Sequence, residues 1–188
     1  MQPSDYFTAI STKSEIVDLI WQQVQEQEGW VEHYSFRAKQ INRDVWVKDT
    51  FLKQLSEKYN LLVGILSMSP NTVYNWHIDS GEPHRKLGIN MLLSESPSHC
   101  LFTDDKDQVL SNSIELHYAP NTYYVFNTKK QHMVVNLSKP RFLLSVTLLG
   151  KNESNDMSYN EMVSANYSED DAISYDELVR ELGDYANA

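Results

Sequence analysis

Two histidines and one aspartate stand at spacings that suit a metal site. His77 and Asp79 lie two residues apart, just before the turn Ser80-Gly81. Alternate residues of a strand point to the same face, so this imidazole and carboxylate should project together at a strand end. His-x-Asp strings are common by chance, and the pair gains weight from His132, which opens a later apolar segment.

These three side chains offer two neutral nitrogens and a carboxylate oxygen to one ion. Two histidines and one carboxylate form the facial ligand set of non-haem Fe(II) oxygenases, which leaves coordination positions open. A structural zinc site usually closes with four protein ligands that include thiolates, and this chain has a single cysteine, Cys100. We therefore predict an Fe(II) centre at His77, Asp79 and His132.

A charged residue opens the last apolar segment of the predicted core, Arg141 to Leu148. A guanidinium in such a segment is costly unless it meets an anion, and its planar fork matches a carboxylate. Taken alone, Arg141 would be assigned to a surface salt bridge. Beside the predicted metal ligands, it is better explained as the anchor of a carboxylate, and Ser145 shares its face of the strand.

The order of these residues resembles that of the 2-oxoglutarate/Fe(II)-dependent oxygenase superfamily. The match is His77-x-Asp79, then His132, then Arg141, within residues 60–149. The closer likeness is to the aspartyl/asparaginyl β-hydroxylase group, which has strings similar to Pro83-His84-Arg85-Lys86-Leu87-Gly88-Ile89 after His77, and to Val125-Phe126 followed by His132-x-Val134-x-Asn136 and Arg141.

The resemblance implies a double-stranded β-helix that holds Fe(II) and binds 2-oxoglutarate as cosubstrate, with the far carboxylate on Arg141. It implies hydroxylation of a peptide, protein or amino-acid side chain, with release of succinate and carbon dioxide. Arg85 resembles an arginine of the group that binds substrate or cosubstrate, although a turn arginine in solvent explains it equally well. The chain departs from the pattern at Leu143, where many members have serine, and at Asp79, where the β-hydroxylase group often has a non-ligating residue.

Other polar and aromatic residues near these motifs are candidates for the same pocket. Tyr74 and Asn90 are pocket candidates of this kind, although Tyr74 and Tyr124 fit a core equally well. Among the remaining histidines, His84 is the nearest alternative ligand, and we expect none of them to bind the metal. The residues predicted to bind the cosubstrate are Arg141, Arg85, Ser145, Asn75 and Tyr124.

The elements that position these residues are mostly short strands. The first third of the chain is predicted to be helical, with a capping box at Thr12 and Glu15 before an apolar stripe over 16–24, and a second helix from about 49 to 59. Later apolar runs alternate with turns. Strands are predicted over 61–68, 72–79, 86–93, 99–103, 113–118, 122–126, 132–137 and 141–149.

This pattern predicts a mainly β fold with N-terminal helices and a jelly-roll core of the cupin-like kind. We expect one oxygenase domain over residues 1–150, with a helical part over 1–60 and the jelly-roll core over 61–150. An acidic C-terminal extension follows over 151–188, with a loop or lid at 151–172 and a short helix at 174–185.

The composition of the chain limits the classes of molecule that it is expected to bind. The chain has 188 residues and a net charge of −10, which argues against nucleic acid or an anionic membrane as the main partner and slightly favours neutral or cationic substrates. A lone cysteine fits a reducing compartment, and no signal peptide or transmembrane stretch is predicted, so we expect a cytoplasmic protein. The alternatives are a cupin-type metal enzyme without 2-oxoglutarate and a non-catalytic jelly-roll binding module.

Overall fold

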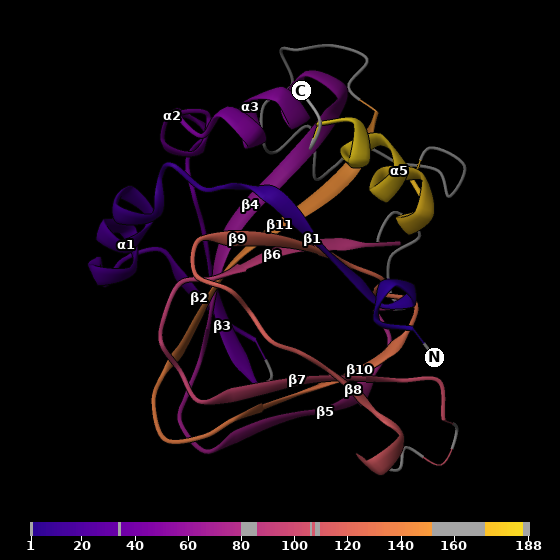
Figure 1. The fold of residues 1–188 in the computed structure, drawn as a ribbon. Helices are drawn as coiled ribbons and strands as arrows, with labels where there is room; N and C mark the ends of the chain where they lie inside the picture. Colours follow the sequence, from indigo (N-terminus) through magenta and orange to yellow (C-terminus); the bar gives the residue numbers. More distant parts are fainter. Residues whose placement is uncertain are drawn as a thin grey trace.

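Two antiparallel sheets form the β layers of the molecule (Figure 1). The computed structural model describes residues 2–33, 35–79, 86–105, 107, 110–151 and 172–185. The larger sheet has the strand order β1 (Phe7–Lys13), β9 (Thr122–Phe126), β6 (Gly88–Leu92), β11 (Arg141–Lys151), β4 (Tyr59–Met68), β3 (Phe36–Gln40), β2 (Trp30–His33). The smaller sheet has the order β5 (Thr72–His77), β10 (Gln131–Asn136), β7 (Ser98–Thr103), β8 (Ile114–Leu116). The predicted mainly β, double-stranded β-helix architecture is confirmed.

The eight strands predicted after residue 60 correspond one by one to β4 through β11. Two of the turns between them contain an asparagine in the left-handed region, Asn71 with φ 55° and Asn121 with φ 54°. Asparagine tolerates this conformation better than most residues with a side chain. Each of the two asparagines follows a proline, and proline is favoured at the turn position just before the asparagine. Turn chemistry therefore sets the strand boundaries here.

The N-terminal third is only partly helical, contrary to the prediction. It contains the helices α1 (Val17–Gln25), α2 (Arg43–Trp46) and α3 (Thr50–Lys58), but also β1 before α1 and β2 and β3 between α1 and α2. These strands extend the larger sheet at both edges. Of these strands, β1 and β2 lie at the edges of the sheet. Three of the four residues of β2 are exposed, so the sequence has no apolar run there.

The capping box predicted at Thr12 and Glu15 does not form. Helix α1 begins at Val17 without a side-chain cap, and Thr12 lies within β1. The Glu15 carboxylate instead accepts hydrogen bonds from the backbone N–H and the hydroxyl of Thr50, at 3.2 and 2.8 Å. The true N-cap of α3 is Asp49, which accepts from the backbone N–H of Leu52 at 3.0 Å.

The main apolar core lies between the larger sheet and the helices, which gather on the side away from the smaller sheet (Figure 1). The last helix, α5 (Tyr175–Tyr185), contributes Leu178 and Leu182 to this core, at the place where a short helix was predicted. Its Tyr175 hydroxyl donates to the Ser4 carbonyl at 2.9 Å.

The predicted lid falls largely on residues 152–171, which lie outside the described residues. No described helix has the length and apolar character needed to cross a membrane.

A buried asparagine holds the turn that leads into β11. The side chain of Asn136 is 1% exposed, and its amide nitrogen donates to the carbonyls of Met68, Ser69 and Lys139 at 2.8 to 3.1 Å. Its amide oxygen accepts from the Ser96 hydroxyl at 2.8 Å. Arg141 pairs with Met68 across the sheet. The hydrogen bonds of Asn136 therefore fix the position at which β11 begins.

Replacing Asn136 with alanine should therefore destabilise the fold by about 1–3 kcal/mol, the usual cost of leaving buried polar groups without partners. Urea unfolding followed by circular dichroism measures this change. The exposed Asn112, whose side-chain amide bonds Asp105 within the described part of the chain, provides a control, and Asn112→Ala should cost less than about 0.5 kcal/mol. Equal losses in the two variants would contradict the role given to Asn136.

Candidate metal centre

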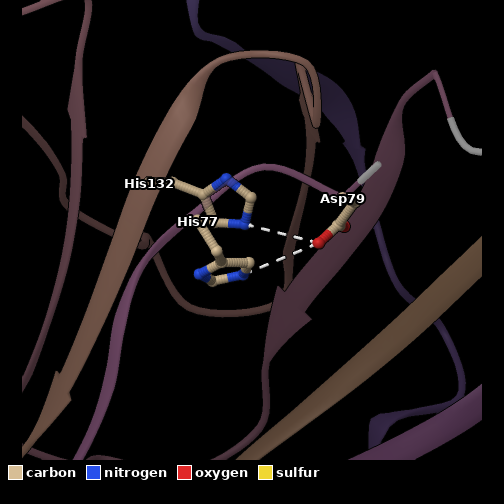
Figure 2. Close-up of side chains that lie close together, drawn as sticks. All are labelled: His77, Asp79 and His132. Carbon is tan, nitrogen blue, oxygen red and sulfur yellow. Dashed lines mark ion pairs between the residues drawn. The ribbon is translucent and has the colours of Figure 1, made fainter. Parts of the chain in front are cut away.

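The structure brings His77, Asp79 and His132 to one point at the end of the smaller sheet (Figure 2). His77 ends β5 and pairs directly with His132 on the neighbouring strand β10. Asp79 follows two residues later, where its backbone N–H donates to the carbonyl of Thr128 at 3.0 Å. Its Oδ1 atom lies 3.6 Å from Nε2 of His77 and 3.9 Å from Nε2 of His132.

Backbone carbonyls orient both imidazoles. Nδ1 of His77 lies 2.6 Å from the carbonyl oxygen of Asn75, and Nδ1 of His132 lies 3.0 Å from that of Lys130. A ring nitrogen that faces a carbonyl oxygen carries a proton, so in a neutral imidazole Nε2 is the nitrogen with the free lone pair, and both Nε2 atoms lie toward Asp79. Such a fixed tautomer prepares both histidines to bind a cation.

Burial reinforces the neutral form of one of these histidines. Desolvation, and then repulsion from His77, lower the pKa of His132 below its ordinary value. Neutral imidazole is the form that binds metals. The His132 ring also packs between Phe102 and Phe126, each with its centroid 5.7 Å away. The environment therefore disfavours protonation and restricts rotation of the ring at the same time.

A β-bulge decides which residues of β5 face the centre. His77 pairs with His132 but Tyr74 pairs with Val134, so two residues of β5 stand opposite one residue of β10. The alternation of faces fails across such a bulge. As a result Tyr74, rather than Asn75, lines the pocket beside His77, with the two ring centroids 4.0 Å apart.

Asn75 was predicted to bind the cosubstrate, and this prediction is wrong because Asn75 does not line the pocket. It is exposed, and its side-chain oxygen accepts from the backbone N–H of Trp76 at 2.9 Å. Tyr124, another predicted ligand, lies behind the pocket. Its hydroxyl donates to the carbonyl of His117 at 3.2 Å and accepts from the N–H of Ala119 at 3.0 Å. Arg85 and the alternative ligand His84 lie outside the described residues.

One pocket between the two sheets contains the three predicted ligands and also Arg141. Arg141, Leu143 and Ser145 all face it from β11, as the alternation of that strand predicts. Arg141 is 6% exposed, and its Nε atom has no hydrogen-bond partner in the described part of the chain. No described carboxylate pairs with it either. A buried guanidinium without an anion is unfavourable, so Arg141 is the candidate in this pocket for binding an anion.

Three further side chains gather around Arg141 in this pocket: Tyr118, Asn90 and Cys100. Asn90 was a pocket candidate, whereas Tyr118 and Cys100 were not identified as pocket residues. Tyr118 follows the three-residue strand β8 in an irregular turn. The strand predicted over 113–118 includes Tyr118, but β8 ends at Leu116, so the alternation of that strand does not place this ring.

Comparisons with known proteins support the fold. The chain matches no protein-family model and no curated protein. Among solved structures it is similar to a prolyl-4-hydroxylase from Pseudomonas putida (TM-score 0.57, 12% identity, 76% of this chain and 90% of that one). It is also similar to a Trichoplax adhaerens prolyl hydroxylase in complex with a hypoxia inducible factor peptide fragment (0.61, 10%, 87% and 89%), and to a 2OG-Fe(II) oxygenase family oxidoreductase from Burkholderia pseudomallei (0.54, 13%, 71% and 78%). At these identities, the similarity establishes a shared fold.

Proposed function

We propose that this chain is an Fe(II)- and 2-oxoglutarate-dependent oxygenase that hydroxylates a peptide or amino-acid side chain. The observation that carries the proposal is the presence, in one pocket, of a two-histidine, one-carboxylate set and a buried arginine without a carboxylate partner among the described residues. The fold shared with 2OG-Fe(II) oxygenases supports it. The motif likeness to the aspartyl/asparaginyl β-hydroxylases supports an amino-acid side chain as the target.

His77, Asp79 and His132 would hold Fe(II), because their nitrogen and carboxylate donors suit this ion and occupy only one face of its octahedron. With 2-oxoglutarate and dioxygen, bound iron supplies the oxidising chemistry of this enzyme class, with succinate and carbon dioxide as coproducts. The protein's own contribution is to bind, orient and exclude water. The two backbone carbonyls that hold the imidazole protons keep both nitrogen ligands in register with Asp79.

Arg141, which lines the same pocket as the metal ligands, would anchor the far carboxylate of 2-oxoglutarate. Apolar side chains, including Leu66, Met68 and Leu143, line this pocket as well. They exclude water, which strengthens the attraction between the guanidinium and a carboxylate. Phe36 and Tyr74 line the same pocket with their rings in an edge-to-face contact at 5.9 Å, and they offer an apolar surface to a substrate side chain.

The direct test is a succinate-release assay with the full chain, Fe(II), ascorbate and a panel of amino acids and peptides. We expect succinate to form only when 2-oxoglutarate and Fe(II) are both present, and to increase with a substrate from the panel. Asp79→Ala should remove this activity. Absence of 2-oxoglutarate binding to the Mn(II)-loaded chain, measured by calorimetry, would instead favour a cupin-type enzyme, for which Arg141 has no assigned ligand.

A further inference from the structure

One turn of the chain contacts two of the three candidate metal ligands. The turn over residues 127–130 joins β9 to β10. Its Thr128 carbonyl accepts from the backbone N–H of Asp79 at 3.0 Å, and its Lys130 carbonyl lies 3.0 Å from Nδ1 of His132. Asp79 follows β5 whereas His132 belongs to β10, so the relative position of these two ligands depends on the conformation of this turn.

Tyr6 is connected to both ends of the turn. Its backbone carbonyl accepts from the N–H of Asn127, the first residue of the turn, at 2.8 Å. Its hydroxyl donates to Oδ2 of Asp104 at 2.8 Å. Oδ1 of the same carboxylate accepts from Nζ of Lys130, the last residue of the turn, at 2.9 Å, and this ammonium lies 5.4 Å from the centroid of the Tyr6 ring. We call Tyr6, Asp104 and Lys130 the Tyr6 cluster.

The pairing of two strands puts Asp104 beside Lys130. β7 and β10 are antiparallel, and Thr103 pairs with Gln131, so one step further along both strands Asp104 stands opposite Lys130. The hydrogen bond from Lys130 lowers the pKa of Asp104 below its ordinary value, and burial raises the pKa of the Tyr6 phenol. At neutral pH, a charged carboxylate therefore accepts from an ammonium and from a protonated hydroxyl.

The ring of Tyr6 is also linked to His132 by packing. The ring centroids of Tyr6 and Phe102 lie 6.0 Å apart, and Phe102 stacks on the His132 imidazole at 5.7 Å with an angle of 29° between the planes. Both Tyr6 and Phe102 are 0% exposed. The imidazole is therefore restrained at its edge by the Lys130 carbonyl and at its face by Phe102, and Tyr6 supports both of these residues.

Stability of the fold does not account for the ion pair in this cluster. The side chains of Lys130 and Asp104 are 31% and 47% exposed, and ion pairs this open to water contribute little to the free energy of folding. The pair instead restrains the one residue whose carbonyl orients His132. Its main consequence is therefore expected at the metal centre.

We propose that Tyr6, Asp104 and Lys130 are positioning residues, which hold this turn in the conformation whose carbonyls orient the metal ligands and so raise the affinity for a divalent cation. The inference rests on the proposed function, because it assumes that His77, Asp79 and His132 hold a metal ion. Loss of a group that hydrogen-bonds a metal ligand typically lowers metal affinity by roughly 10- to 100-fold. The Tyr6 cluster lies one contact further out, so its loss should have a smaller effect, about 5-fold.

The test compares Lys130→Met with Lys129→Met in the full chain, with Mn(II) binding measured by calorimetry. Both changes remove one positive charge from the same turn, and Lys129 is an exposed residue outside the cluster. Charge alone predicts equal or tighter binding of a cation in both variants, because a repulsion is lost. The proposed role predicts the opposite for Lys130→Met, whose affinity should fall by about 5-fold. Lys130→Arg keeps a donor for Asp104 and should bind within about 2-fold of the wild type.

Tyr6→Phe tests the cluster without any change in charge. It removes the hydroxyl that donates to Asp104 and should also weaken Mn(II) binding. Combined with Lys130→Met, it should cause little further loss, because residues of one hydrogen-bond network are not additive. Tyr123→Phe is the matched control, since its hydroxyl is also buried but donates to Asp49, at 3.0 Å, away from the metal centre. This control should bind Mn(II) as the wild type does.

Nitrogen NMR of the imidazole rings in the metal-free chain gives a readout that needs no bound ion. His132 should have its proton on Nδ1 in the wild type, and should show a mixture of tautomers in Lys130→Met. Wild-type Mn(II) affinity with an unchanged tautomer in Lys130→Met would overturn the inference and leave the proposed function in place. So would equal losses of affinity in Lys130→Met and Lys129→Met. A wild-type chain that binds no Mn(II) would overturn both.

Discussion

Replacing His77 with alanine should abolish oxygenase activity and weaken Mn(II) binding by more than about 100-fold, because even the outer-shell partners of metal ligands typically contribute 10- to 100-fold. The fold should persist, since His77 lies at the end of an edge strand and outside the main apolar core. Calorimetric titration with Mn(II) measures the first effect, and circular dichroism checks the second.

His99 offers the matched control for this experiment. It is an exposed histidine on β7 of the same sheet, and its Nδ1 lies 2.7 Å from a Glu115 carboxylate oxygen. His99→Ala should leave Mn(II) binding and turnover at the wild-type level. Full Mn(II) affinity in His77→Ala would remove this histidine from the ligand set and would require a different metal site.

Replacing Arg141 with alanine should weaken 2-oxoglutarate binding by about 30-fold or more while leaving Mn(II) binding unchanged. Truncating one side of a buried charge pair typically costs about 2–5 kcal/mol, and about 1.4 kcal/mol corresponds to a tenfold change in affinity. Arg141→Lys should restore only part of the loss, because an ammonium group cannot reproduce the two-pronged contact of a guanidinium. Calorimetry on the Mn(II)-loaded variants measures both.

Arg180 on the exposed face of α5 is the control for the removal of an arginine. Arg180→Ala should have the affinity of the wild type for 2-oxoglutarate. Unchanged affinity in Arg141→Ala would show that the far carboxylate is held elsewhere or that no such ligand binds. It would favour a cupin-type metal enzyme over an oxygenase of the proposed class.

The residues that a single regular strand positions were predictable from the sequence. Arg141, Leu143 and Ser145 share one face because β11 keeps its alternation through this segment. His77 and His132 were also identified, because each lies at a strand end next to a turn that the sequence marks clearly. Local rules are sufficient at these positions, since no irregularity intervenes between the turn and the side chain.

The remaining site residues depend on features that local rules do not contain. Asn75 and Tyr74 were both pocket candidates, and the bulge in β5 decides that Tyr74 lines the pocket and Asn75 does not. Tyr118 reaches Arg141 from an irregular turn. Both positions are set by how strands pair across the sheets, so they become visible only in three dimensions.

The order of strands in the larger sheet has a consequence for synthesis on the ribosome. β11 lies between β6 and β4, so it joins the group β1-β9-β6 to the group β4-β3-β2. A nascent chain that has reached only residue 140 lacks β11, the strand that pairs with both β6 and β4 in the complete sheet. Such late, long-range pairing slows folding and exposes strand edges to aggregation. Because Arg141 opens β11, this arginine takes its place in the pocket in the same step that joins the two groups of strands.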